Sequence, residues 1–253
     1  MSKIYVMQQG KGPVVVLSHA LGCDLRMWDG VAQALQDRFT VVRYDQRGHG
    51  RSPAIGEAFG MDDLADDAAE VIQALGVGAV HFVGLSMGGM TAQALAVRHP
   101  ALLRSITIAN SASYYDDAAR AGWQARVDTV LTQGVPAIAE GAMQRWFTPE
   151  FRAHQAERVR ALRAGLEATV AVPYAAACKA VAEIDFRDSN RHIACPVLVI
   201  AGARDEATPP AMSEALHAQI PNAQLASLPA AHLSAVEMPM EFAELVARFI
   251  AGL

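Results

Sequence analysis

The stretch Gly84-Leu85-Ser86-Met87-Gly88 constrains the fold of this chain more than any other feature. Residues 80–83 before it predict a short buried strand, and residues 87–98 after it predict a helix. In a G-x-S-x-G turn between a strand and a helix, the serine has a strained backbone and an exposed hydroxyl. Small residues must flank it because the two backbones nearly touch, and three glycines, the last of them Gly89, meet this need. The context favours a catalytic Ser86 over an ordinary tight turn.

A serine hydroxyl is a poor nucleophile near neutral pH, so a base and an orienting acid must lie elsewhere in the chain. In turns of this kind they follow in the order serine, acid, histidine. Residues 197–201 predict a buried parallel strand, and Asp205 on the loop after it is the expected acid, with Glu206 as the alternative. Another strand is predicted at 223–228. His232 lies on the loop after that strand and is therefore the expected base.

The other histidines are weaker candidates for the base. His19 lies upstream of the serine, at the end of an early strand, and is expected to fix its loop without taking part in the chemistry. The other six histidines are expected to be surface or helix-end residues: His49, His81, His99, His154, His192 and His217.

An acyl-transfer site also needs two N–H donors aimed at the oxyanion that forms in the transition state. One donor comes from the residue after the nucleophile, here Met87, and the other from the loop after an early strand. Residues 14–18 predict that strand, and residues 19–22 form the loop, with Ala20 where a glycine is usual. We therefore expect the Leu21 N–H to be the second donor.

Strands and helices alternate along most of the chain. Further strands are predicted at residues 1–6, 40–44 and 103–109. Further helices are predicted at residues 31–38, 64–75 and from Pro239 to Ile250. The Gly-rich turn at 45–52 lacks the Gly-Lys-Ser/Thr ending of a phosphate-binding loop and is expected to be structural. This alternation predicts an α/β fold with a mostly parallel central sheet and helices on both faces.

Residues 111–191 interrupt the alternation, because their apolar residues fall at helical spacing and no strand is evident. The segment is too long for a loop in a compact domain. It predicts a helical lid, inserted into a core formed by residues 1–110 and 192–253, that covers Ser86 and shapes its pocket. Six lid residues are candidates for lining that pocket, with helix packing as the alternative for each: Trp123, Arg126, Arg145, Trp146, Phe147 and Tyr174.

Composition excludes several classes of protein. With 52% hydrophobic and 19% charged residues, the 253-residue chain can bury a large core. A net charge of −5 gives no basic surface for nucleic acid or an anionic membrane. There is no apolar run of about 20 residues and no signal peptide, so we expect a cytoplasmic protein. Cys23, Cys178 and Cys195 are irregularly spaced, and we expect three packing residues, no disulfide and no metal or other cofactor.

With Ser86, Asp205 and His232 in this order, the chain resembles the α/β-hydrolase family. Six further stretches are distinctive: LGCDLRMW (21–28), YDQRGHGRS (44–52), HFVGLSMGGM (81–90), RWFTP (145–149), ATPP (207–210) and AHLSAVE (231–237). Through them the chain resembles, within that family, the 3-oxoadipate enol-lactonases over nearly its whole length. The first loop departs from their pattern, since Asn-Ser is expected where His19-Ala20 stand.

The resemblance implies that an enol-lactone is opened to 3-oxoadipate through an acyl-enzyme on Ser86, late in bacterial breakdown of aromatic compounds. The carboxylate of this substrate implies a cation in the pocket, for which Arg126 and Arg145 are the candidates. The alternatives are a general carboxylesterase or perhydrolase, a cofactor-independent dioxygenase-like enzyme and a non-catalytic ligand receptor. Haloalkane dehalogenases and epoxide hydrolases need a carboxylate at the position of Ser86. The expected partner is a small lactone or ester, and the sequence predicts no oligomeric state.

Overall fold

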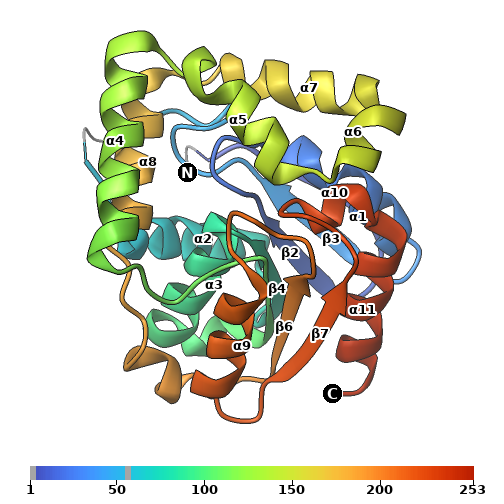
Figure 1. Ribbon diagram of the computed structural model, residues 1–253. Helices are drawn as coiled ribbons and strands as arrows, with labels where there is room; N and C mark the ends of the chain where they lie inside the picture. The colour runs from blue at the N-terminus through green and yellow to red at the C-terminus, as the bar shows by residue number, and fades with distance from the viewer. Residues whose placement is uncertain (1–3, 55–57) are drawn as a thin grey trace.

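The computed structural model describes residues 4–54 and 58–253, which fold around a seven-stranded sheet (Figure 1). The strand order is β1-β3-β2-β4-β5-β6-β7; β1 is antiparallel to β3, and the other neighbours are parallel. The strands are β1 (Val6–Gly10), β2 (Val14–Ser18), β3 (Thr40–Tyr44), β4 (Val80–Leu85), β5 (Leu103–Ala109), β6 (Val197–Gly202) and β7 (Gln224–Leu228).

Helices cover both faces of this sheet, so the central strands β4 and β6 are buried along their whole length. Helices α1 and α11 pack against each other on one face, while α2, α3 and α9 lie on the other (Figure 1). The bounds of these helices are Asp29–Leu35 (α1), Met61–Leu75 (α2), Met87–Arg98 (α3), Pro210–Gln219 (α9) and Pro239–Ala251 (α11), with the short helix α10 (Ser234–Glu237) before α11.

The predicted fold class is confirmed, and most predicted elements have the predicted bounds to within one or two residues. The first helix is an exception, because it ends at Leu35 rather than at 38 and follows a 3₁₀ turn, Leu25–Trp28. The strand predicted at 1–6 is wrong at Ile4 and Tyr5, and among the described residues of that stretch only Val6 belongs to a strand. Residues 1–3 lie outside the described part of the chain, and β1 begins only at Val6.

The segment between β5 and β6 is helical, as predicted, and we call its helices α4 to α8 the cap. In Figure 1 they lie above the core and along one side of it. An isolated bridge joins Tyr114 to Asp185, where the chain leaves the core and returns to it. The helices of the cap are α4 (Asp117–Gln133), α5 (Pro136–Trp146), α6 (Pro149–His154), α7 (Ala156–Glu167) and α8 (Ala171–Ala182).

One short stretch of the cap, between α5 and α6, is bonded directly to the segment that follows His232. The Leu233 N–H donates to the Trp146 carbonyl oxygen at 3.0 Å. The Glu237 carboxylate accepts from the Thr148 backbone N–H at 2.7 Å and from the Thr148 hydroxyl at 3.2 Å. The cap is therefore fixed at this end to the loop that carries the expected base.

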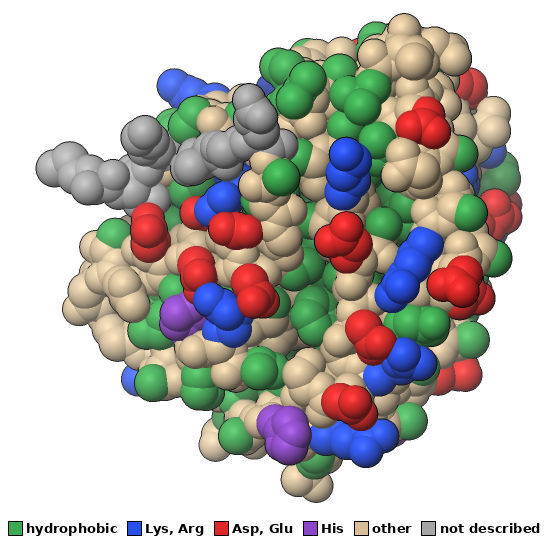
Figure 2. Space-filling view, turned by 90° about the vertical axis from the view of Figure 1, so that its left-hand side faces the viewer, with side chains coloured by type: hydrophobic (Ala, Val, Ile, Leu, Met, Phe, Trp, Pro, Cys, Tyr) green, Lys and Arg blue, Asp and Glu red, His purple; other side chains and the backbone are tan. Residues whose placement is uncertain are grey.

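The surface is mixed in character. On the face seen in Figure 2, acidic and basic side chains are interspersed with apolar ones. Some of these charges pair across helices, as Arg98 does with Asp62 and Asp66. Among the helices that the structure describes, none combines the length and the apolar character needed to span a membrane.

Candidate active site

Ser86 lies on the sharp turn between β4 and α3, with φ 56° and ψ −116°. This is a backbone conformation that few non-glycine residues adopt. The flanking glycines allow it, because a Cβ on Gly84 would lie 1.9 Å from the Gly88 carbonyl oxygen. A Cβ on Gly88 would lie 2.1 Å from the Ser18 carbonyl oxygen. The crowding thus requires glycine at both positions and holds the serine in the position that the motif predicts.

The structure brings together the three residues expected to form the catalytic group. Ser86 Oγ lies 2.9 Å from His232 Nε2, and His232 Nδ1 lies 2.9 Å from Asp205 Oδ2. All three side chains are buried, and they come from the turns after β4, β6 and β7. The alternative acid Glu206 is exposed and forms no hydrogen bond with His232. This chain of hydrogen bonds has the geometry of a serine, a general base and an orienting carboxylate.

The Asp205 carboxylate is held by its own loop. Oδ1 accepts from the backbone N–H groups of Ala207 at 2.8 Å and Thr208 at 2.9 Å, and Oδ2 accepts from the Thr208 hydroxyl at 2.7 Å. Burial alone would raise the pKa of Asp205, but the charge of His232 and the surrounding hydrogen bonds outweigh it and lower that pKa to about 2. Asp205 therefore remains a carboxylate at any physiological pH and can stabilise a positive charge on His232.

The two backbone N–H groups expected to bind the oxyanion have no hydrogen-bond acceptor of their own among the described residues. Met87 is the first residue of α3, so its N–H has no partner within the helix. The Leu21 N–H has no acceptor in the part of the chain that the structure describes. His19 fixes this loop: its Nε2 accepts from the Gln46 N–H at 2.9 Å, so its Nδ1 carries the proton and donates to the Ala20 carbonyl at 2.8 Å. Burial lowers the pKa of His19 to about 4, so the ring is neutral.

The expectation of a surface or helix-end position is wrong for two of the other histidines. His49 is buried with its ring centroid 5.3 Å from that of His19, and burial lowers its pKa to about 3. The turn that carries it packs against the cap, since a Cβ on Gly48 would lie 2.7 Å from the Pro173 side chain of α8. His81 is buried on the central strand β4, where its Nδ1 lies 2.8 Å from the Ser105 hydroxyl of β5.

Two aromatic residues of the cap lie over the loop that carries Leu21. Trp146 and Tyr174 are both buried. A Cβ on Gly22 would lie 3.1 Å from Tyr174 Cε2 and 3.6 Å from Trp146 Cη2. These two side chains therefore cover the loop next to the expected oxyanion donor. Phe147 instead stacks on Phe151 of the cap, with 5.1 Å between the ring centroids. This contact fits the alternative expected for Phe147, that it packs between helices.

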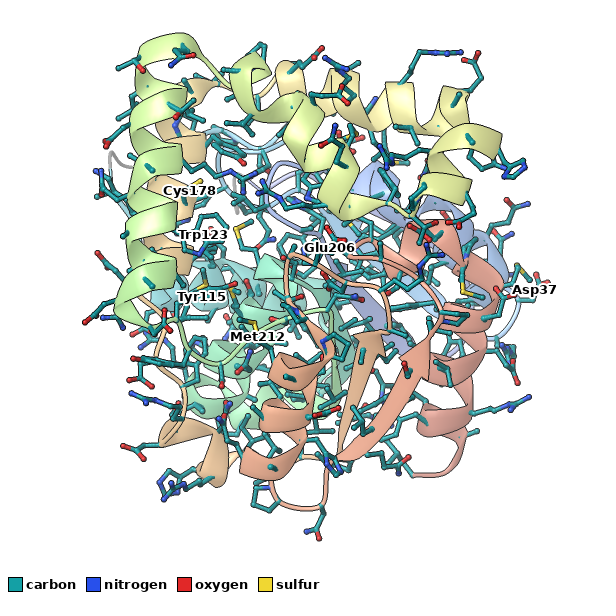
Figure 3. All side chains as sticks on the ribbon, in the orientation of Figure 1. Asp37, Tyr115, Trp123, Cys178, Glu206 and Met212 are labelled. Carbon is teal, nitrogen blue, oxygen red and sulfur yellow. The ribbon has the colours of Figure 1, made fainter. Side chains whose placement is uncertain are left out.

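The two cap arginines expected to bind a substrate carboxylate have no anionic partner among the described residues. The Arg126 guanidinium lies over the ring of Trp123, 5.4 Å from its centroid, and Trp123 meets Tyr115 edge to face on the inner side of α4 (Figure 3). Arg145 borders an open polar cleft of about 590 Å³ beside the loop of Asp205. Within the described residues neither arginine forms an ion pair or a hydrogen bond. Arg145 is exposed, but partial loss of water around its guanidinium and the charge of Arg126 lower its pKa, so the two cations repel each other.

Sequence reasoning missed three residues that contact the triad, namely Thr208, Ser111 and Asn110. The Thr208 hydroxyl bonds to the acid, and the Ser111 hydroxyl donates to the Ser86 carbonyl oxygen at 2.8 Å. The Asn110 amide donates to Asp205 Oδ2 at 2.9 Å. The signal that could have found them is local: each is a Ser, Thr or Asn on the loop that follows a strand, where short polar side chains bond to nearby backbone groups.

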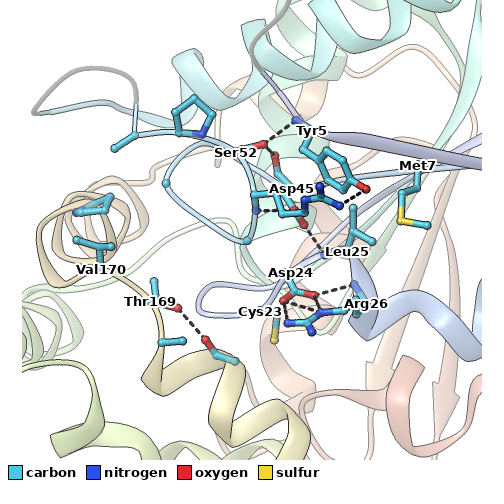
Figure 4. A pocket seen from close by; sticks show the side chains of 18 residues that line it. Tyr5, Met7, Cys23, Asp24, Leu25, Arg26, Asp45, Ser52, Thr169 and Val170 are labelled. Atoms are coloured by element: carbon cyan, nitrogen blue, oxygen red, sulfur yellow. Dashed lines mark hydrogen bonds and ion pairs between the residues drawn. The ribbon is translucent and has the colours of Figure 1, made fainter.

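A larger cavity, of about 630 Å³, lies away from the triad, between the turn at 45–52 and the junction of α7 and α8 (Figure 4). The charged side chains that line this cavity already have hydrogen-bond or ion-pair partners in the protein. Asp45 accepts from two backbone N–H groups, and Arg51 donates to the Tyr5 hydroxyl at 2.7 Å. Asp24 and Arg26 form an ion pair at 2.6 Å. None of Ser86, Asp205 and His232 lines this cavity, so it is separate from the site described above.

The three cysteines are free thiols, two of them buried. Burial raises the pKa of Cys23 and Cys195, and raises that of Cys178 to about 12, so none is poised to act as a thiolate. Within residues 4–54 and 58–253, no cluster of three His, Cys, Asp or Glu side chains could hold a metal ion.

Comparisons with known proteins identify the family of this chain. The model of the α/β hydrolase fold family matches residues 13–239. The 3-oxoadipate enol-lactonase 2 of Acinetobacter baylyi is 38% identical over 234 residues, which is 92% of this chain and 87% of the relative. The crystal structure of the enol-lactonase from Burkholderia xenovorans LB400 is 32% identical, with a TM-score of 0.94, and the match covers 98% of this chain and 96% of the other.

An esterase is also similar over nearly the full length. The malate-bound structure of a thermophilic esterase from Thermogutta terrifontis is 28% identical, with a TM-score of 0.93, and the match covers 98% of this chain and 93% of the other. The resemblance to the enol-lactonases is thus confirmed over most of the sequence. Because the family model and these relatives span almost the whole chain, the protein belongs to the α/β-hydrolase fold family and is a hydrolase.

Proposed function

We propose that this protein opens 3-oxoadipate enol-lactone to 3-oxoadipate through an acyl-enzyme on Ser86. The observation that carries the proposal is the hydrogen-bonded chain from Ser86 through His232 to Asp205, with 2.9 Å at each step. The likeness to named enol-lactonases over nearly the whole length supports the choice of substrate. We place the reaction in the cytoplasm, where the three free cysteines stay reduced.

The first half of the reaction forms the acyl-enzyme. Ser86 Oγ attacks the lactone carbonyl carbon while His232 Nε2 takes the hydroxyl proton. The carbonyl oxygen gains negative charge and is bound by the N–H groups of Leu21 and Met87, each worth about 3 kcal/mol in the transition state. When the tetrahedral intermediate collapses, the ring C–O bond breaks and the enolate oxygen takes the proton from His232. The enol then becomes a ketone, which favours ring opening.

The second half releases the acid. A water molecule gives a proton to His232 and attacks the ester carbon of the acyl-enzyme, and the same N–H groups bind the new oxyanion. The Ser86 oxygen leaves with the proton held by His232, so the free enzyme is restored. Asp205 keeps its charge throughout and stabilises the imidazolium at both stages.

The substrate is an anion, and among the described residues Arg126 and Arg145 of the cap have no protein anion to neutralise them. We expect Arg126→Ala to raise KM for the anionic lactone by about tenfold or more, because a charge-assisted hydrogen bond is worth about 1.5–3 kcal/mol. Arg145→Ala should raise KM less, since Arg145 is exposed and borders an outer cleft. Steady-state kinetics on the lactone measures both effects.

The neutral ester p-nitrophenyl acetate serves as the control in this experiment. KM for that ester should be unchanged in both variants, since it carries no negative charge. A lactone KM that stays at the wild-type value in both variants would exclude these arginines as carboxylate ligands. It would leave the proposed reaction itself untouched.

The substrate assignment is tested by kcat/KM for the enol-lactone beside p-nitrophenyl acetate and butyrate. We expect about 10⁵ M⁻¹s⁻¹ or more for the lactone, within the range of efficient enzymes, and weak turnover of the aryl esters. A general carboxylesterase is the second candidate, favoured by the likeness to the thermophilic esterase. Rapid turnover of the aryl esters with little lactone activity would establish that alternative.

A further inference from the structure

We propose that Asn110 is the positioning residue of this site. Its buried side-chain amide holds the loop of Asp205 and the loop of His232 in a fixed relative position. The inference rests on the proposed function, in which Ser86, His232 and Asp205 act together. Asn110 comes directly after β5, the strand beside the Ser86 turn, and its residue surface is fully buried. It touches none of the reacting atoms, so its effect must pass through the residues that it binds.

The side chain of Asn110 joins two loops that are far apart in the sequence. Its Nδ2 donates to Asp205 Oδ2 at 2.9 Å and to the Ala231 carbonyl oxygen at 3.2 Å. Its Oδ1 accepts from the Ser234 hydroxyl at 2.5 Å. The amide therefore binds the catalytic acid and also the residues on both sides of His232.

The bond to Asp205 reaches the oxygen that matters for catalysis. Asp205 Oδ2 is the same atom that faces His232 Nδ1 at 2.9 Å. With Asn110 on one side of this oxygen and the imidazole on the other, the carboxylate cannot rotate without losing a charge-assisted hydrogen bond. The orientation of the imidazole toward Ser86 then follows from that of the carboxylate.

The neighbours of Asn110 hold the nucleophile turn. The Ser86 N–H donates to the Ala109 carbonyl oxygen at 2.9 Å, and the Ser111 hydroxyl donates to the Ser86 carbonyl oxygen at 2.8 Å. Residues 109–111 therefore contact the nucleophile turn, the acid and the base loop. A displacement of about 1 Å in such a site can lower a rate about 10²-fold, which makes this tripeptide a determinant of the rate constant.

The local structure requires an asparagine at this position. Its φ of 46° lies in the left-handed region, which Asn enters more readily than most residues. An aspartate carboxylate could accept from Ser234 but could not donate to Asp205, and glycine would supply neither bond. Gly202 leaves the space that this amide occupies, because a Cβ at that position would lie 2.5 Å from Asn110 Nδ2.

The first test compares Asn110→Gly with Asn110→Ala. Both remove the amide, but only the glycine variant keeps an unstrained left-handed backbone. We expect kcat for p-nitrophenyl acetate to fall about 10- to 100-fold in both, with KM within about twofold of wild type. The alanine variant should melt at a lower temperature than the glycine variant at similar kcat, which separates backbone strain from positioning.

The second test is the pH profile of Asn110→Asp. Two adjacent carboxylates share a proton, and the pKa of one is raised. Below that pKa the shared proton restores a donor to Asp205 Oδ2. The ratio of variant to wild-type kcat should therefore increase as the pH falls, while a purely structural role predicts a ratio independent of pH.

The matched control is Asn222→Ala, since Asn222 also has a positive φ, of 58°, but is exposed on a surface turn. Its kcat should equal that of the wild type. Asn110→Gly with wild-type kcat, or a loss confined to KM or melting temperature, would overturn the proposal.

Labelling by a fluorophosphonate distinguishes this failure from failure of the proposed function. In that reaction Ser86 Oγ bonds to phosphorus, fluoride leaves, and His232 accepts the hydroxyl proton. Wild-type protein that is not labelled at Ser86 would refute the proposed function. Wild-type protein that is labelled, with Asn110→Gly labelled at the same rate, would refute only the role of Asn110.

Discussion

Replacing Ser86 by alanine is expected to lower kcat for the enol-lactone and for aryl esters by about 10⁴- to 10⁶-fold, the range seen when a triad nucleophile is removed. The fold should persist, because the hydroxyl makes its hydrogen bond to His232 and alanine keeps the same Cβ. Steady-state turnover and thermal unfolding of the same preparation measure the two effects.

Ser213→Ala is the matched control, because Ser213 is buried and its hydroxyl has no partner in the part of the chain that the structure describes. Its turnover should be that of the wild type. Turnover of Ser86→Ala within about tenfold of wild type would point to another nucleophile or to dioxygenase-like chemistry, and oxygen consumption would then identify the latter.

Replacing Asp205 by asparagine is expected to lower kcat by about 10⁴-fold, while the loop that carries it keeps its backbone hydrogen bonds. The asparagine oxygen can still accept from the N–H groups of Ala207 and Thr208. Its amide would then face His232 Nδ1 with a donor in place of an acceptor. The imidazole would carry its proton on Nε2, where it cannot accept the proton of Ser86. The measurement is kcat with both the lactone and p-nitrophenyl acetate.

Glu206→Gln provides the comparison, since Glu206 follows Asp205 directly and is exposed. It should keep kcat within about twofold of the wild type, in keeping with surface substitutions elsewhere. If the two variants exchanged these outcomes, Glu206 would be the orienting acid, and the hydrogen bond seen between Asp205 and His232 would be incidental.

Most of the fold could be predicted because its elements carry strong local patterns. The strands at 14–18, 40–44 and 103–109 and the helix at 87–98 have the bounds that their apolar residues predict. The edge of the sheet could not be predicted in the same way. β1 pairs antiparallel with β3 rather than with β2, its neighbour in the chain, and pairing between distant strands leaves no periodicity in the sequence.

The site residues also differ in whether a local pattern or a long-range contact defines them. Ser86, Asp205 and His232 were predicted because each follows a strand in a fixed order. Asn110 was not, because its contact with Asp205 spans 95 positions and depends on how two loops meet. The burial of His49 beside His19 likewise depends on how two distant loops meet. Helical spacing alone could not show that both Arg126 and Arg145 lack a protein anion.

The bonds between the cap and the base loop restrict how this hydrolase can evolve toward new substrates. Trp146 and Thr148 are hydrogen-bonded to Leu233 and Glu237. The α5–α6 end of the cap therefore cannot move away from the core without displacing the backbone beside His232. Helix α4 makes none of these bonds, whereas Pro173 and Tyr174 of α8 pack against the core at Gly48 and Gly22. Selection for a different acyl group can therefore remodel α4 most freely, while a change that moves the backbone at 146–148 also moves the loop of His232.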